Sequence, residues 1–222
     1  LDDDRELANA LYNYGLAVGF EADDQTIALP LLEESREIYL RLDDVAGLAD
    51  TAWGIGNILL DLATRDSVPV EEVLRWFGEA ADHYRRAGNE FGQGWSMFEV
   101  GALYVRTGQF AEAWEPLRDA TTLFWSHRDV SGLVMTVSEI AAMAFGLGDT
   151  QRAYRLSGMA ESLRKETGTD LVIADFNVME GLEPETLAKL EGEEKEAFEE
   201  GMDCPLEEIV AYALDGPVGG PE

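Results

Sequence analysis

The sequence predicts an all-α protein, a solenoid of four helix pairs that ends in a C-terminal helical cap. Small residues recur about 40 residues apart, and apolar residues with helical spacing lie between them. Three columns of small residues keep the same step: Gly15, Gly56, Gly101 and Ala141; Ala28, Val73, Ala113 and Ala153; and Ser35, Ala80, Ala120 and Ala160. A fourth column closes each unit at Asp44, Asn89, Asp129 and Thr169. Columns that stay in step indicate one helical unit copied in tandem, and such repeat proteins usually bind other proteins.

The first unit is predicted to contain one helix over 5–20 and a second over 25–42. Asp23 and Asp24 precede the second helix and are suited to cap its amino terminus. One apolar stripe along the first helix is formed by Leu7, Leu11, Tyr14 and Val18.

The other three units repeat this arrangement, and the second has a longer loop between its helices. Their predicted helices cover 46–63 and 69–87 in the second unit, 91–106 and 110–127 in the third, and 131–147 and 150–167 in the fourth. Pro30 and Pro116 fall inside predicted second helices. Because proline has no N–H to donate, we expect a local bend at each.

The repeats are predicted to occupy 1–169 and to be followed by a cap over 170–216. The four units cover about 4–44, 45–89, 90–129 and 130–169. The predicted cap has a connector over 171–179 and short helices over 184–190, 193–201 and 205–214. A cap of this kind covers the open end of a solenoid. The Gly- and Pro-rich residues 217–222 predict a disordered tail.

The small residues have a physical reason. Two helices joined by a short turn approach closely only where the facing side chains are small. Glycine inside a helix costs about 1 kcal/mol relative to alanine, so close packing must supply the reason for its presence. Large apolar residues stand four positions after the small residues of the second helices and fill the space beside them: Leu32, Phe77 and Leu117.

Acidic residues dominate the charge. The sequence holds 45 Asp and Glu against 16 Lys and Arg, a formal net charge of −29. Such a domain repels phosphate backbones and anionic membranes, so we expect neither nucleic-acid binding nor membrane association. Two interpretations of the acidity stay open: it serves solubility, or it serves a basic protein or peptide partner.

Cysteine and histidine are scarce. Cys204 is the single cysteine, and only His83 and His127 accompany it, so we expect no intrachain disulfide, no metal site and no cofactor. No catalytic constellation stands out either, so we expect no enzyme activity. Because the chain starts at Leu1 and has no secretory signal pattern, we expect a piece of a longer, cytoplasmic protein.

The spacing of small and apolar residues resembles that of tetratricopeptide repeats (TPR). The matching residues are Leu11, Tyr14, Gly15, Val18, Ala28, Leu32 and Ser35 in the first unit and Met97, Val100, Gly101, Tyr104, Ala113, Leu117 and Ala120 in the third. The second unit departs from the pattern through its insertion and Val73. The resemblance implies a right-handed solenoid whose first helices line a concave groove.

The period is longer than the usual TPR repeat of about 34 residues. In this the chain is similar to the C-terminal regions of bacterial LuxR-type and cyclase-linked signalling ATPase regulators. The stretches 160–164, 198–201 and 206–214 resemble the end of those regions. The resemblance implies a sensor or regulatory arm, with the ATPase and DNA-binding parts outside this chain. The sequence itself contains neither a phosphate-loop motif nor a helix-turn-helix segment.

Positions beside the packing stripe of the first helices are the candidate contact residues of the groove. They are Asn9, Tyr12, Asn13 and Leu16 in the first unit, Asp50, Trp53 and Asn57 in the second, Trp95, Phe98, Glu99 and Arg106 in the third, and Met135, Ser138, Glu139 and Phe145 in the fourth. Aromatic rings beside carboxylates suit a peptide with apolar anchors and a basic residue. The alternative is that Trp53, Trp95 and Phe98 belong to the core.

Two functions remain open after this reading. The first is a protein- or peptide-binding sensor or regulatory arm of a larger signalling or transcriptional regulator. The alternative is a free-standing adaptor that assembles other proteins through the same groove. A homo-oligomer is compatible with both.

Overall fold

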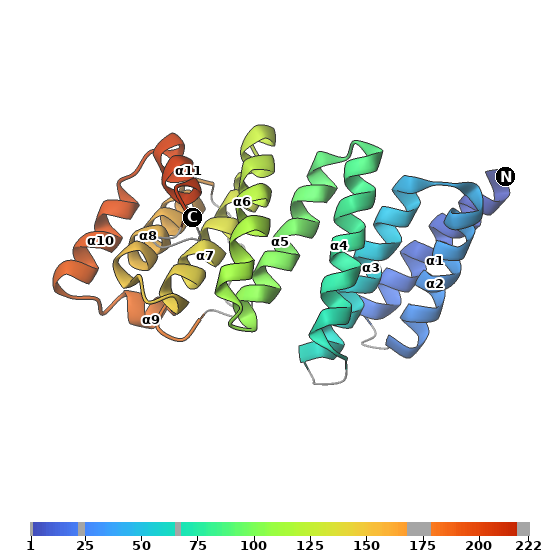
Figure 1. Cartoon of the computed structure of the whole chain (residues 1–222), viewed down its shortest axis with the longest axis horizontal. Helices are drawn as coiled ribbons and strands as arrows, with labels where there is room; N and C mark the ends of the chain where they lie inside the picture. Colours follow the sequence, from blue (N-terminus) through green and yellow to red (C-terminus); the bar gives the residue numbers. More distant parts are fainter. Residues whose placement is uncertain (1, 22–24, 65–67, 168–178, 217–222) are drawn as a thin grey trace. The chain divides into compact units, whose positions relative to one another are not determined.

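The computed structural model describes residues 2–21, 25–64, 68–167 and 179–216, and all regular structure within these ranges is helical (Figure 1). Helices pack in adjacent pairs, which confirms the predicted all-α class. The chain divides into two compact units, residues 1–96 and 97–222. The boundary falls inside helix α5 (Glu90–Arg106) and therefore inside the third predicted repeat.

Unit 1 is built from two helix pairs and the first residues of α5. In it α1 packs against α2, α2 against α3, and α3 against α4. The bounds are α1 Asp2–Glu21, α2 Gln25–Leu42, α3 Val45–Thr64 and α4 Val70–Ala87. The prediction 25–42 agrees with α2 at both ends. Helix α2 runs on through Pro30, so this proline does not end its helix.

Unit 2 contains the rest of α5, three long helices and the predicted cap. Helix α7 packs against α6 and α8, α10 packs against α8, and α11 touches α6, α7 and α8. The bounds are α6 Phe110–His127, α7 Val130–Gly146, α8 Thr150–Thr167, α9 Pro184–Leu187, α10 Gly192–Met202 and α11 Leu206–Leu214. Helix α9 is shorter than the predicted 184–190. The predicted connector 171–179 lies outside the described residues except for Met179, as do Asp23, Asp24 and the predicted tail.

The first column of small residues lies where paired helices meet. Gly56 of α3 faces the Phe77 ring of α4, and Gly101 of α5 faces Leu117 of α6. A Cβ atom on Gly101 would lie 2.6 Å from the Leu117 Cγ, closer than side chains tolerate. Gly15 of α1 meets Leu32 in the same way, at 3.1 Å. The predicted packing role is confirmed at these three glycines.

A second repeated motif joins each unit to the next, and the sequence reasoning recognised only its first member. The side-chain oxygens of Asp44, Asn89 and Asp129 accept hydrogen bonds from the N–H groups of Gly47, Gly92 and Gly132, at 3.1, 2.9 and 3.1 Å. The fourth column therefore caps the following helix rather than closing the unit before it. Thr169, its last predicted member, lies outside the described residues.

The glycines of this motif carry an aromatic ring from the preceding helix. The rings of Tyr39, Tyr84 and Phe124 lie against Gly47, Gly92 and Gly132, where a Cβ would overlap each ring. One turn later a hydroxyl residue donates to each glycine carbonyl, at 2.9 to 3.0 Å: Thr51, Ser96 and Thr136. Cap, glycine, ring and hydroxyl thus recur together at three helix starts.

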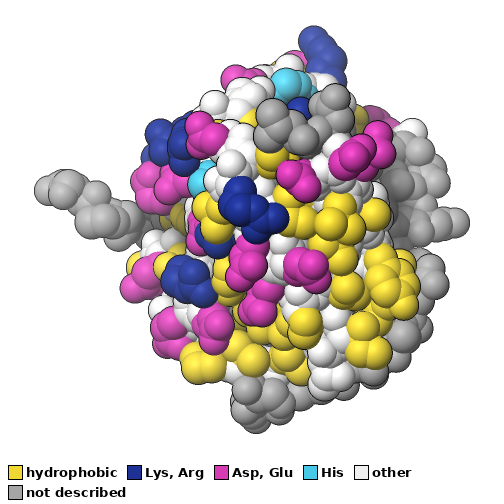
Figure 2. Space-filling view, turned by 90° about the vertical axis from the view of Figure 1, so that its right-hand side faces the viewer, with side chains coloured by type: hydrophobic (Ala, Val, Ile, Leu, Met, Phe, Trp, Pro, Cys, Tyr) yellow, Lys and Arg dark blue, Asp and Glu magenta, His cyan; other side chains and the backbone are white. Residues whose placement is uncertain are grey.

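Helix α1 presents part of its predicted apolar stripe to solvent. Leu7 and Tyr14 are 48% and 60% exposed, while Leu11 and Val18 are half-buried. The equivalent residues of α3, Leu48 and Ile55, are 5% and 1% exposed, because α2 packs on that helix. Figure 2 faces the end where α1 and α2 lie and shows apolar side chains gathered over one part of it.

The two capping stretches that resemble one another's partners in regulators meet in unit 2. A Cβ atom on Gly158 of α8 would overlap the carbonyl oxygen of Phe198, and one on Gly201 of α10 would overlap that of Arg155. The Ser162 hydroxyl donates to the Met202 carbonyl oxygen at 2.9 Å. Helices α8 and α10 therefore cross with their backbones in contact.

Replacing Gly101 by alanine tests the packing explanation. The added methyl group must displace Leu117, so we expect Gly101→Ala to lower the free energy of unfolding by about 1–3 kcal/mol. Gly78→Ala is the matched control, because a Cβ at Gly78 of α4 meets nothing within 4 Å. That variant should be more stable by up to about 1 kcal/mol. Urea unfolding measures both, and equal effects of the two substitutions would contradict the explanation.

Candidate functional site

The predicted groove residues fall into two groups, one in each unit, and each group is described separately. Unit 1 holds Asn9, Tyr12, Asn13, Leu16, Asp50, Trp53, Asn57 and Trp95. Unit 2 holds Phe98, Glu99, Arg106, Met135, Ser138, Glu139 and Phe145.

Asp50 of α3 is the centre of the group in unit 1. The Tyr84 hydroxyl donates to its Oδ1 at 2.7 Å. Burial raises the pKa of the Asp50 carboxyl, whereas the Tyr84 hydrogen bond lowers it. The carboxylate in turn adds to the effect of burial in raising the pKa of Tyr12. The structure therefore brings Tyr12 and Asp50 together and adds Tyr84, which the sequence reasoning missed.

The remaining residues of this group surround that centre. Asn9 accepts a hydrogen bond from the Tyr39 hydroxyl at 2.5 Å, and Asn57 donates to the Trp53 carbonyl oxygen of its own helix at 2.9 Å. Trp53 is half-buried against the cluster that contains Tyr84. Trp95 packs edge-on against Phe91, with ring centroids 6.3 Å apart. Asn13 is exposed and Leu16 half-buried.

Two carboxylates and one guanidinium form the group in unit 2. Glu99 of α5 and Glu139 of α7 occupy equivalent positions, two residues before Gly101 and Ala141. Burial raises the pKa of each to about 7, and the charge of Arg106 opposes the shift. The charge of Glu99 raises the pKa of Glu139 further. One cation thus serves two desolvated acids. The Arg106 Nε is buried and has no hydrogen-bond partner among the described residues.

The two phenylalanines predicted for this group differ in exposure. Phe98 is 2% exposed, so the core interpretation fits it and we leave it out of the proposed contact surface. Phe145 is half-buried and packs edge-on against Tyr154, with ring centroids 6.0 Å apart. Gly181 lies over the same Phe145 ring.

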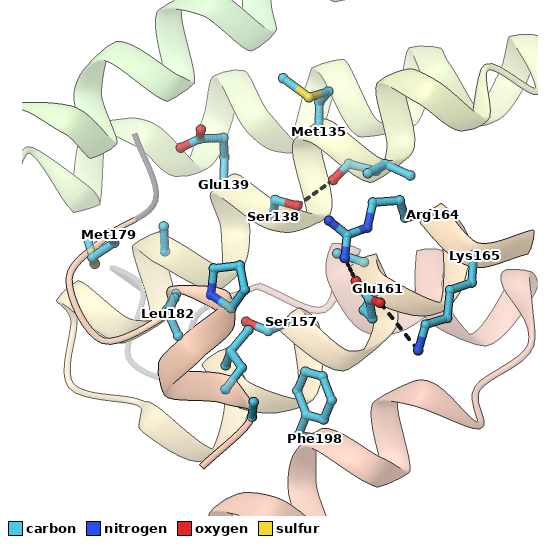
Figure 3. A pocket seen from close by; sticks show the side chains of 16 residues that line it. Met135, Ser138, Glu139, Ser157, Glu161, Arg164, Lys165, Met179, Leu182 and Phe198 are labelled. Carbon is cyan, nitrogen blue, oxygen red and sulfur yellow. Dashed lines mark hydrogen bonds and ion pairs between the residues drawn. The ribbon is translucent and has the colours of Figure 1, made fainter. Parts of the chain in front are cut away.

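A cavity of about 390 Å³ opens beside Glu139, and we call it the α7–α10 pocket (Figure 3). Met135, Ser138 and Glu139 of α7 form one wall, and these three residues were predicted. The other walls come from α8, from residues 179–188 and from Phe198 of α10. The further lining residues are Val134, Ala142, Ser157, Ala160, Glu161, Arg164, Lys165, Met179, Leu182, Pro184, Leu187 and Ala188.

The wall formed by residues 179–188 has its own internal support. The Glu183 carboxylate accepts hydrogen bonds from the Gly181 N–H and the Thr186 hydroxyl, both at 2.9 Å. Hydrogen bonds from backbone N–H groups lower the pKa of Glu183. This local turn places Leu182 and Leu187 against the pocket. Single-sequence patterns carry no signal for a wall that depends on a turn so far from α7.

A second, polar cavity of about 430 Å³ lies between α8, α10 and α11. The Arg152 Nη2 donates to the Tyr212 carbonyl oxygen at 2.8 Å. The guanidinium groups of Arg152 and Arg155 lie 4.7 and 4.9 Å from the Tyr212 ring centroid, and Arg155 also pairs with Glu200 at 3.3 Å. These contacts fasten α10 and α11 to α8 and account for both arginines.

The remaining candidates for chemistry have structural partners. His83 Nε2 lies 3.5 Å from Glu79 on its own helix, and the Cys204 thiol donates to the Glu200 carbonyl oxygen at 3.2 Å. A search of the described residues for three or more His, Cys, Asp and Glu side chains able to hold a metal ion found none. None of the described helices is long and apolar enough to span a membrane.

Comparison of the chain with protein-family models, with curated proteins and with solved structures found no match.

The acid pair predicts a measurable pH dependence. A carboxyl group whose pKa is higher in the folded than in the unfolded chain stabilises the fold while protonated, and this contribution is lost as the pH rises through the folded value. Between the ordinary Glu value of 4.5 and about 7, we expect the wild type to lose stability. The Glu99→Gln, Glu139→Gln double variant should lose less, by on the order of 2 kcal/mol.

Urea unfolding at about pH 5 and about pH 8 measures this difference. Glu196→Gln, at an exposed position of α10, is the control and should follow the wild type. Parallel pH profiles of the double variant and the wild type would contradict the assignment of raised pKa values to the pair.

Proposed function

We propose that this chain is a protein- or peptide-binding domain of TPR-like helical repeats, whose partner carries basic side chains. The finer architecture belongs to the same proposal: a right-handed solenoid of four helix pairs with its binding residues on the first helices. The observation that carries the proposal is the set of desolvated carboxylates on α3, α5 and α7.

Asp50, Glu99 and Glu139 all have raised carboxyl pKa values whose largest cause is burial. A buried carboxylate that is incompletely paired is costly, and a cationic side chain from a partner relieves that cost. The surrounding field favours the same partner, because the chain carries a net charge of −29. Acidity concentrated at buried positions is not explained by solubility alone.

Aromatic side chains beside the acids supply the apolar half of the interface. Trp53 and Trp95 are half-buried and lie on the same helices, α3 and α5, as Asp50 and Glu99. Partly exposed tryptophans are common anchors in protein interfaces and attract cationic groups to their faces. A peptide with alternating apolar and basic residues has both kinds of contact available.

The proposed setting is cytoplasmic, as the sensor or regulatory arm of a larger signalling or transcriptional regulator. The resemblance of the repeats to those of LuxR-type and cyclase-linked regulators supports it. In this setting the bound partner favours one arrangement of the helices, and that preference is passed on to a switch domain. The alternative, a free-standing adaptor, uses the same contact residues.

Selection from a random peptide library on the immobilised domain tests the charge of the partner. We expect enrichment of peptides with Arg or Lys beside apolar residues. For a selected peptide, the Glu99→Gln, Glu139→Gln double variant should bind about tenfold more weakly, a loss of about 1.4 kcal/mol, and Glu196→Gln should bind as the wild type does. Enrichment of acidic peptides, or equal affinity in the double variant, would argue against a basic partner.

The aromatic contacts have a separate test. We expect Trp53→Ala and Trp95→Ala to weaken binding of the selected peptide by about 1 to 2 kcal/mol each, measured by fluorescence anisotropy. Trp125→Ala is the control, because Trp125 lies on the second helix α6 beside Arg128, 5.6 Å from its ring centroid. Unchanged affinity in both test variants would remove the tryptophans from the binding surface.

A further inference from the structure

We propose that the α7–α10 pocket binds a small aliphatic carboxylate, a ligand with one unbranched apolar chain and one anionic head group. The proposal does not depend on the peptide-binding function, because the pocket lies within unit 2 and has its own walls. Three observations carry it: the character of the walls, the state of the polar groups between them, and the charge at one side.

The walls are predominantly apolar and come from four segments of the chain. Val134, Met135 and Ala142 belong to α7, and Ala160 belongs to α8. The turn after residue 178 adds Met179, Leu182, Pro184 and Leu187, and α10 adds the ring of Phe198. In Figure 3 the labelled side chains surround a common space. Its volume of about 390 Å³ lies in the range of small-molecule sites, roughly 300–1,000 Å³.

The hydroxyl groups in the walls are already engaged. Ser138 donates to the Val134 carbonyl oxygen at 2.8 Å, and Ser157 donates to that of Ala153 at 2.9 Å. Neither hydroxyl needs a polar partner from a ligand. The interior is therefore suited to a plain hydrocarbon chain rather than to a sugar or a polar peptide.

Positive charge gathers at one side of the pocket. Arg164 and Lys165 both pair with the single carboxylate of Glu161, the Lys165 Nζ at 3.3 Å from its Oε1. Two cations against one anion leave a local charge of +1, in a chain whose net charge is −29. The Arg164 and Lys165 side chains are 37% and 62% exposed. They are thus accessible to an anionic head group, which would share them with Glu161.

Negative charge lies on the opposite side. Figure 3 places Glu139 across the pocket from Arg164 and Lys165, and Glu139 interacts with Arg106 and Glu99 outside the pocket lining. This separation of charge gives the ligand one orientation, with the carboxylate at the α8 side and the chain directed between Leu182 and Phe198.

Isothermal titration calorimetry with decanoate, decanol and decylamine, each below the concentration at which it forms micelles, tests the ligand class. We expect decanoate to bind about tenfold more tightly than decanol, and decylamine to bind more weakly than both. Octanoate should bind roughly tenfold more weakly than decanoate, because it buries two fewer CH₂ groups. Binding of none of these probes, or tighter binding of decylamine than of decanoate, would overturn the proposal.

Two variants locate the site. The Arg164→Gln, Lys165→Gln double variant should lower the affinity for decanoate about tenfold and leave that for decanol unchanged. Lys195→Gln is its control, because Lys195 pairs with Glu199 on α10, at 3.6 Å. Ser157→Phe should fill the cavity and abolish binding of both probes, with helicity checked by circular dichroism. If the double variant only lowers stability and keeps its affinity for decanoate, the two cations serve the end of α8 and the proposal fails.

Discussion

The close approach of helices at glycine is the constraint on which both units depend. At Gly15, Gly56 and Gly101 a large apolar side chain from the paired helix occupies the volume of the missing Cβ. Each contact sets the distance between two helices, and that distance decides which neighbouring positions are buried. Glu99 stands two residues before Gly101, and this close packing accounts for its desolvation.

The acid pair and the α7–α10 pocket are two results of the same packing around α7. Its neighbours are α6 and α8, and the close crossing of α8 with α10 at Gly158 and Gly201 brings Phe198 to the pocket. Because the crossing brings backbone against backbone, it leaves little freedom for α10 to shift. The site is thus bounded by rigid helices on three sides and by a hydrogen-bonded turn on the fourth.

Much of the fold was predictable because the signals are local. Apolar periodicity and turn residues predicted α2, α6 and α8 at both ends, since the helix boundaries coincide with changes in residue type. The stripe on α1 was predicted as well, but its burial depends on a neighbouring helix, and Leu7 and Tyr14 remain exposed. The role of Asp44, Asn89 and Asp129 as caps was missed, although the glycine three residues after each is visible in the sequence.

The candidate site was predictable only in part. Positions on the first helices were inferred from periodicity, and Glu99, Arg106 and Glu139 do lie together. Asp50 was identified, but its partner Tyr84 comes from another helix 34 residues away along the chain. The pocket walls after residue 178 depend on the turn at Glu183, which no helical pattern announces. Pairings of this kind arise from tertiary packing, so a repeat pattern shows where a side chain points but not what it meets.

The motif of cap, glycine, ring and hydroxyl has a consequence for how such a chain changes its length. All of its members lie within a short stretch on either side of a helix junction, from Tyr39 to Thr51, Tyr84 to Ser96 and Phe124 to Thr136. The instructions for joining two units are therefore carried by the junction and not by the body of either unit. A whole unit inserted or deleted between two junctions would keep a compatible cap and ring at both ends. The array is in this sense modular, and gene duplication could extend it without redesign of the neighbouring helices.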